Sequence, residues 1–263
     1  MSGTHVEAWA EKRVVISADA DALADSVATR FLGRMSKRVD DDRIAHVSLT
    51  GGSMGAAVLQ AASRSARRDR IDWTRVHFWW SDERFVPRAH ADRNEGQARA
   101  ALLDALDIPE ANIHAVAASD EGIDLDAAAA RYADELARFG TDGEPWPSFD
   151  VCFLGVGPDA HIASLFPDRP EILITDRATV AVRDSPKPPP DRVSMTRPVI
   201  NSSQRVWMVL TGADKASALG LALAGASYAS VPAAGAKGRK RTVFFVDGAA
   251  AAQVPPELID GEY

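Results

Sequence analysis

Short apolar runs alternate with longer amphipathic stretches along most of the chain. The runs are rich in β-branched and aromatic residues, which is typical of buried strands. They cover residues 13–16, 44–49, 73–80, 113–116, 149–154, 178–182, 192–196, 205–210 and 242–246. The stretches between them predict helices over residues 18–38, 54–67, 92–106, 125–139 and 214–224, with a short alanine-rich helix after residue 246.

Strands that alternate with helices in this way predict an α/β fold, with a mostly parallel sheet covered by helices on both faces. No internal repeat or long polar linker divides the chain, so we expect a single domain over residues 1–263. The proline-rich segment 185–190 is neither helix nor central strand. We interpret it as a functional loop rather than a domain boundary.

Composition narrows the class of protein. A hydrophobic fraction of 46% and a charged fraction of 25% are those of an ordinary globular protein. The net charge of −7 argues against a nucleic-acid or membrane surface, and the basic clusters at residues 64–70 and 237–241 are interpreted as a helix end and a loop. The one cysteine, Cys152, excludes a disulfide framework, and residues 1–15 lack the pattern of a signal peptide. We therefore expect a cytoplasmic protein.

The most distinctive stretch is residues 149–166, FDVCFLGVGPDAHIASLF. A buried strand ends there in a glycine turn, which is followed by Asp159 and His161. Histidine suits general-base chemistry near neutral pH, and Asp159 is placed to orient its ring. The alternative is a structural histidine in a buried loop. The six histidines show no paired metal-binding spacing, and no GxSxG motif supports a serine hydrolase.

A second strand end reads LTGGS at residues 49–53. Gly51 and Gly52 allow close backbone approach, and the free amides of the helix that follows Ser53 suit an anion such as phosphate. The GxxxxGK[ST] spacing of a nucleotide-binding loop is absent. The alternative is an ordinary helix cap formed by Ser53 or Thr50.

Two further strand ends carry charge. Asp82 and Arg84 follow the strand at 73–80. They could form a surface ion pair, which contributes little. Alternatively, Asp82 is a buried helper at the sheet edge and Arg84 reaches an oxygen of the ligand. Lys187 lies within the proline-rich segment and Arg192 follows it. Lys215 opens a helix, where a cation is opposed by the dipole unless an anion lies nearby. Because parallel strands bring their carboxyl ends to one edge, all four ends are expected to converge.

Six blocks in this order resemble the 6-phosphogluconolactonase family, which is related to the glucosamine-6-phosphate deaminases. They are LTGGS (49–53), SDERFVP (81–87), DRNEG (92–96), LGVGPDAHIASLFP (154–167), SPKPPPDRVSMT (185–196) and TGADKASAL (211–219). The resemblance implies a modified Rossmann-type sheet and hydrolysis of 6-phospho-glucono-1,5-lactone to 6-phosphogluconate, the second step of the oxidative pentose phosphate pathway. It implies no metal or organic cofactor and a small sugar-phosphate lactone as the partner; a monomer is expected.

The resemblance also implies roles for individual residues. His161 would be the base that activates water, and Asp159 would orient it or support it electrostatically. Asp82, the helper at the sheet edge, is also expected among the catalytic residues. Arg84 would bind substrate oxygens or the developing oxyanion. The 6-phosphate would be held by Gly51, Gly52, Ser53, Arg192 and Lys215. Lys187 is also expected to bind the substrate.

In one position the sequence departs from the family pattern. The family reads Asp-Gly-His where this chain has Asp159, Ala160 and His161. A positive φ would strain an alanine at this point, and we expect a negative φ. Two other functions remain as alternatives, an aminosugar-phosphate isomerase or deaminase and a non-catalytic sugar-phosphate sensor.

Overall fold

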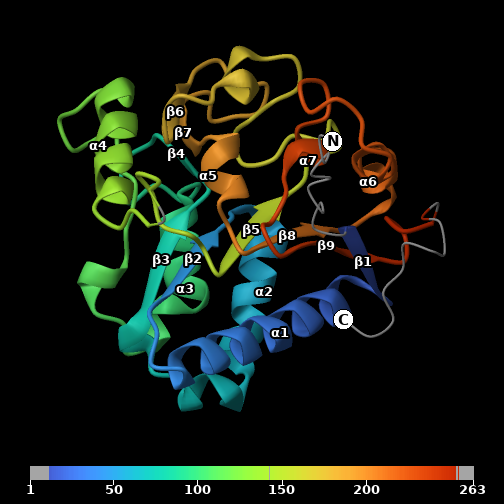
Figure 1. Ribbon diagram of the computed structural model, residues 1–263, viewed down its shortest axis with the longest axis horizontal. Helices are drawn as coiled ribbons and strands as arrows, with labels where there is room; N and C mark the ends of the chain where they lie inside the picture. Colours follow the sequence, from blue (N-terminus) through green and yellow to red (C-terminus); the bar gives the residue numbers. More distant parts are fainter. Residues whose placement is uncertain (1–11, 142, 253, 255–263) are drawn as a thin grey trace, which may run out of the picture.

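The central element is a six-stranded sheet in which every neighbouring pair is parallel (Figure 1). The computed structural model describes residues 12–141, 143–252 and 254. The sheet has the order β1-β9-β8-β5-β2-β3. Its strands are β1 (Lys12–Ser17), β2 (Ala45–Leu49), β3 (Val76–Trp80), β5 (Val151–Gly155), β8 (Arg205–Leu210) and β9 (Arg241–Asp247).

Helices cover both faces of this sheet, as the sequence predicts. The longer helices are α1 (Ala20–Asp40), α2 (Gly52–Arg64), α3 (Asn94–Ala101), α4 (Leu125–Ala137) and α6 (Ala216–Leu223), and the short ones are α5 (Arg197–Asn201) and α7 (Pro232–Gly235). Alternate strand residues face opposite sides: Val151 and Phe153 pack with α1, α2 and α3, whereas Cys152 and Leu154 pack with α4 to α7. Figure 1 shows the first group of helices below the sheet and the second above it.

A second sheet of three antiparallel strands lies beside α4 and α5, and the sequence pattern does not predict it (Figure 1). Its order is β4 (Asp82–Arg84), β7 (Arg192–Met195) and β6 (Thr179–Val182). β4 follows β3 after one residue and pairs with β7, so that Arg84 lies opposite Arg192. This pairing ties the proline-rich segment to the carboxyl edge of the main sheet.

Several predicted elements are shorter than expected. The strand at 113–116 is reduced to a single bridge between Ile113 and Phe78, and residues 248–252 form turns in place of a helix. The Asp247 carboxylate accepts from the amides of Gly212 (3.0 Å) and Ala250 (2.8 Å), which holds the chain in a turn after β9. Short 3₁₀ helices lie between the other elements. They are η1 (Ala66–Arg70), η2 (Trp73–Arg75), η3 (Leu103–Ala105), η4 (Glu110–Asn112), η5 (Pro170–Leu173) and η6 (Ala213–Lys215).

Helices α5 and α7 were not predicted, because five and four residues are too few to show a helical repeat. Each has a proline in its first turn, Pro198 and Pro232, where the missing N–H costs no hydrogen bond. Among the described residues no helix is both long and apolar enough to cross a bilayer.

Candidate active site

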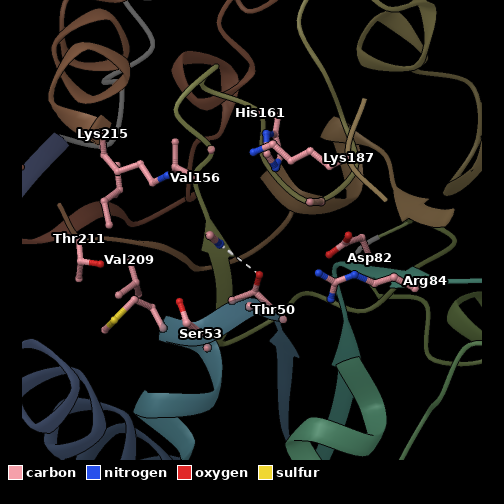
Figure 2. A pocket seen from close by; sticks show the side chains of 18 of the residues that line it. Thr50, Ser53, Asp82, Arg84, Val156, His161, Lys187, Val209, Thr211 and Lys215 are labelled. Atoms are coloured by element: carbon pink, nitrogen blue, oxygen red, sulfur yellow. Dashed lines mark hydrogen bonds between the residues drawn. The ribbon is translucent and has the colours of Figure 1, made fainter. Parts of the chain in front are cut away.

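A pocket of about 310 Å³ opens where β2, β5 and β8 end, and it gathers the predicted site (Figure 2). All ten candidate residues lie in or directly behind it. The nine that line the pocket are Gly51, Gly52, Ser53, Asp82, Arg84, His161, Lys187, Arg192 and Lys215. The tenth, Asp159, bonds to the His161 ring. The expected convergence of the strand ends is therefore observed.

The His161 ring is held by a carboxylate and an aromatic face. Its Nδ1 lies 2.5 Å from Oδ1 of Asp159, and its ring centroid is 4.7 Å from that of Phe166. A carboxylate only accepts, so Nδ1 carries the hydrogen, and Nε2 of the neutral ring keeps a lone pair. The His161 side chain is 13% exposed and lines the pocket. A base with its free nitrogen at a pocket is the arrangement needed to activate water.

The charge state of this pair follows from its surroundings. Burial lowers the pKa of His161 below its ordinary value of 6.5, although the Asp159 carboxylate opposes that shift. His161 is therefore neutral, and able to accept a proton, at pH 7. Lys187 lies 4.0 Å from Asp159, next to His161 in Figure 2, and adds a positive charge to the same wall.

The turn that presents His161 leaves no room for a side chain at Gly157. A Cβ there would lie 2.1 Å from Nδ1 of His161 and 2.3 Å from Oδ1 of Asp159. Gly157 also accepts from the amide of Ala160 and donates to the carbonyl of His161, at 2.9 and 3.0 Å. The glycine is thus required for the His161–Asp159 pair to close against the backbone.

The expectation of a negative φ at Ala160 is wrong, because its φ is +65°. The turn closed by Gly157 imposes this conformation, and the Ala160 carbonyl is fixed from outside by the amide of Ala233 at 3.0 Å. Ala160 is 2% exposed, so its methyl group is packed. A left-handed alanine costs roughly 1–2 kcal/mol, which the contacts of the turn offset.

The start of α2 forms the floor of the pocket. Its N-cap is Gly51, which makes no side-chain capping hydrogen bond, and Gly52 has a φ of +83°. Neither Ser53 nor Thr50 caps the helix, so the ordinary-cap alternative is wrong; Thr50 Oγ1 instead accepts from the amide of Gly155 at 3.1 Å (Figure 2). The first amides of a 13-residue helix are therefore directed at the pocket, where an anion is stabilised.

Arg84 occupies the space that Gly51 leaves open. A Cβ on Gly51 would lie 2.5 Å from Nη1 of Arg84 and 1.7 Å from Oδ1 of Asn94. Asn94 in turn donates to the Asp82 carbonyl at 2.8 Å. Nε and Nη1 of Arg84 are buried without a hydrogen-bond partner in the described structure. A buried guanidinium without an acceptor is costly, and an anionic ligand would supply one.

Asp82 and Glu83 are buried, at 6% and 1% exposure, so the surface ion pair considered for this segment is wrong. Asp82 accepts from the hydroxyl of Ser164 at 2.7 Å and lies 3.9 Å from Arg192. Glu83 caps α3, because it accepts from the amides of Asn94 and Glu95 and also from that of Arg84. Burial raises the pKa of Glu83 to about 7, against these hydrogen bonds and the nearby Arg93.

Sequence reasoning missed the part played by Glu83 and Asn94. Both lie within the SDERFVP and DRNEG blocks, which carried the family resemblance but gave no role to these two residues. A helix start placed two residues before GQAR, with a glutamate eleven residues before that start, was the available signal. Their contacts hold the backbone that carries Arg84.

Three cations complete the pocket wall. Arg192 is 4% exposed and donates to the carbonyls of Pro189 (3.1 Å) and Lys187 (2.8 Å), so it fixes the proline-rich loop as well as lining the pocket. Burial lowers the pKa of Lys187, and the charges of Lys215 and Arg192 lower it further while Asp159 opposes them. Like charges gathered in this way destabilise one another unless an anion is bound.

No group of three or more His, Cys, Asp or Glu side chains in the described part of the chain is arranged to hold a metal ion. The buried thiol of Cys152 has its pKa raised to about 12 by burial, so it stays protonated and unreactive. The chemistry available at this pocket is that of a neutral histidine, a buried arginine and a helix start.

Comparisons with known proteins identify the family of this chain. Residues 18–245 match the family model described as glucosamine-6-phosphate isomerases/6-phosphogluconolactonase. A 6-phosphogluconolactonase of Streptomyces coelicolor is 45% identical over 94% of this chain and 96% of its own length. One from Mycobacterium tuberculosis is 46% identical over 92% and 98%, respectively.

Solved structures agree with this fold. The crystal structure of a 6-phosphogluconolactonase from Thermotoga maritima superposes with a TM-score of 0.78 at 27% identity, over 90% of this chain and all of the other. A monomeric glucosamine-6-phosphate deaminase shares the fold alone, with a TM-score of 0.76 at 17% identity, over 91% and 99% of the two chains. The match over most of the chain and the close relatives agree, and the chain belongs to the glucosamine-6-phosphate isomerase/6-phosphogluconolactonase family.

Proposed function

We propose that this pocket hydrolyses 6-phospho-D-glucono-1,5-lactone to 6-phospho-D-gluconate. The observation that carries the proposal is the His161–Asp159 pair. Asp159 occupies Nδ1 of His161, which leaves Nε2 free, and the ring lines a pocket with four cationic side chains and the start of a helix. The same activity is predicted from the sequence, and relatives that bear the name 6-phosphogluconolactonase at 45% and 46% identity confirm that prediction.

The proposed reaction is a single displacement by water. Nε2 of His161 takes a proton from the water as its oxygen bonds to the lactone carbonyl carbon, and the carbonyl becomes a tetrahedral oxyanion. When the oxyanion collapses, the bond from the carbonyl carbon to the ring oxygen breaks, and the His161 imidazolium returns its proton to that oxygen. Asp159 stabilises the imidazolium formed in between.

Arg84 is proposed to stabilise the oxyanion or a neighbouring substrate oxygen. Its buried Nε and Nη1 need an acceptor, and a charge that develops in the reaction is the one that a fixed donor stabilises best. Asp82, which lies within ion-pair reach of Arg192, is proposed to keep this wall ordered through Ser164. General-base catalysis supplies about 10²- to 10⁴-fold, enough for an activated ester.

The phosphate group is proposed to sit on the start of α2. Gly51, Gly52 and Ser53 present backbone amides, and Lys187 and Lys215 neutralise the charge. Arg192 is proposed to act mainly by fixing the loop that carries Lys187, since its donors are used on that loop. Anchoring the phosphate orients the lactone toward His161.

The decisive experiment follows lactone hydrolysis, corrected for spontaneous hydrolysis, beside ammonia release from glucosamine 6-phosphate. We expect turnover of the lactone only. Ammonia release without lactone hydrolysis would assign an aminosugar-phosphate deaminase, and tight binding of 6-phosphogluconate without turnover would assign a sensor. Lys215→Gln is expected to raise KM about tenfold, whereas Lys37→Gln, far from the pocket, should leave KM unchanged.

The cellular setting is part of this proposal. A metabolic hydrolase whose only cysteine is buried suits a reducing cytoplasm. All the residues assigned here belong to one chain and one α/β domain, so we propose that the monomer is the active form, with no nucleic-acid or membrane partner.

A further inference from the structure

A basic groove lies at the opposite edge of the main sheet from the active-site pocket. It consists of two adjoining hollows of about 510 and 440 Å³, which share Arg34, Lys37, Arg205 and Lys240. Among the described residues, eight lysines and arginines line the groove against two aspartates, in a chain whose net charge is −7. The eight are Arg30, Arg34, Lys37, Arg38, Arg43, Arg205, Lys240 and Arg241.

The fold builds this concentration of charge from separate elements. Four of the cations recur at spacings of four, three and one residues on α1, which places them along one flank of its last turns. Arg205 and Arg241 are the first residues of β8 and β9, and Asp150 directly precedes β5. These positions are the amino ends of the parallel strands, about 15–20 Å from the carboxyl ends that form the active site.

Three of the cations in the groove lack an ion-pair partner among the residues that the structure describes. Asp150 pairs with Arg38 at 3.1 Å, and Asp41 pairs with Arg43 at 2.6 Å. Arg34, Lys37 and Lys240, by contrast, form no ion pair with any residue that the structure describes. Burial raises the pKa of Asp150, although Arg38, Arg205 and Arg34 all act against that shift. The part of the lining that the structure describes therefore holds more positive than negative groups, and three of its cations have no ion-pair partner there.

We propose that the basic groove binds a condensed-phosphate anion, a small ligand with two or three linked phosphoryl groups. The active-site pocket, with four cations in about 310 Å³, is matched to one phosphate, and the groove is both larger and richer in charge. A single phosphate would leave several cations of the groove unpaired, whereas linked phosphates reach from the α1 flank to the strand starts. Inorganic polyphosphate and the tail of a nucleoside triphosphate share this chemistry.

The test is calorimetric titration of the full chain with tripolyphosphate at 150 mM salt. We expect one saturable site per chain, and a double variant Lys37→Gln/Lys240→Gln should weaken Kd at least tenfold. The matched control Arg67→Gln/Arg70→Gln removes two exposed charges from η1, outside the groove, and should change Kd less than twofold. Lys215→Gln, in the active-site pocket, should also leave Kd unchanged. All variants should keep the far-UV circular dichroism of the parent.

The outcomes separate the proposal from its rivals. If the groove variant and the η1 control lose affinity for tripolyphosphate equally, the binding is non-specific charge attraction, and the proposed site is overturned. Loss in Lys215→Gln alone would move the ligand to the active-site pocket, and orthophosphate binding as tightly as tripolyphosphate would overturn the ligand class. A ten-nucleotide RNA binding more tightly than tripolyphosphate would also overturn it. ATP added in place of tripolyphosphate distinguishes a nucleotide from the inorganic anion.

Discussion

Two histidine–carboxylate pairs lie near the same sheet, one beyond the end of β5 and one beside β3, and only the first belongs to the active-site pocket. His161 meets Asp159 at 2.5 Å, and His114 meets Glu135 at 2.7 Å. In both pairs Nδ1 faces the carboxylate. The pairs differ in the second nitrogen: Nε2 of His161 is left for the pocket, whereas Nε2 of His114 lies 2.8 Å from Nδ1 of His77.

The second pair is part of an aromatic stack. His114 lies on Trp79, with ring centroids 3.8 Å apart, and Trp79 Nε1 donates to Nδ1 of His46 at 3.2 Å. His114 is 4% exposed, so its ring is closed off from ligands. A histidine–carboxylate pair is therefore not a catalytic site by itself; what matters is whether the other ring nitrogen is left for a substrate.

The largest effect expected from this comparison is on turnover. His161→Gln should lower kcat by about 10²- to 10⁴-fold, because the general base is lost while the phosphate contacts remain. KM should stay within a few-fold. The measurement is lactone hydrolysis with the uncatalysed rate subtracted.

His114→Gln is the matched control, since it breaks the same kind of pair away from the pocket. Its kcat should stay within twofold of the parent, although its melting temperature should fall. Near-parental turnover in His161→Gln would remove that residue from the mechanism.

The aromatic stack should instead affect how the free energy of unfolding depends on pH. Burial lowers the pKa of His46 to about 3 and that of His77 to about 4, with neighbouring histidines adding to both shifts. Below pH 6.5 these histidines are protonated in the unfolded chain but stay neutral in the folded protein. The free energy of unfolding therefore falls as the pH drops toward 4. His46→Asn should shrink the difference in unfolding free energy between pH 7 and pH 5 by up to about 2 kcal/mol, measured by urea denaturation.

Exposed His90 provides the control for this measurement. His90→Asn removes a histidine outside the stack, so the fall in stability between pH 7 and pH 5 should persist. An unchanged pH dependence in His46→Asn would show that the stack does not govern acid stability.

Asp159→Asn tests how the carboxylate supports the base. The amide is uncharged, so the imidazolium formed in the reaction loses stabilisation, and kcat should fall about tenfold. Asp159 raises the pKa of His161 against burial, so its removal should lower that pKa further. The acid limb of the kcat profile should therefore move to lower pH, which a purely structural defect would not cause.

Glu135→Gln is the corresponding change at the stack, and its profile should overlay that of the parent. A limb that moves to higher pH in Asp159→Asn would contradict the assigned role of the carboxylate.

The convergence of the site was predictable because it follows from topology. Parallel strands bring their carboxyl ends to one edge, and β5, β2 and β3 are neighbours in the sheet, so the strand-end residues at 49–53, 81–84 and 159–161 meet. The bounds of β8 were predicted without error, since Arg205 is followed by a continuous apolar run over residues 206–210. The six motifs also predicted the family, which the match over residues 18–245 confirms.

Features that depend on distant contacts were not predictable. β4 is three polar residues, Asp82–Arg84, with no apolar alternation, and only its pairing with β7 makes it a strand. Glu83 resembles a surface charge in the sequence, yet amides at the start of α3 allow its burial. The sign of φ at Ala160 is set by a turn that Ala233 fixes from far along the chain.

The smallest expected effect concerns Ala160. This residue has a strained, left-handed backbone in the turn that presents His161. Ala160→Gly removes a left-handed penalty of roughly 1–2 kcal/mol, but it also removes a packed methyl group and makes the unfolded chain more flexible, which together cost about as much. The free energy of unfolding should therefore change by less than about 1 kcal/mol in urea titrations, and kcat should stay within a few-fold. A large gain in kcat would mean that the alanine displaces His161 from its productive position, and the strain would then limit catalysis rather than be absorbed by the turn.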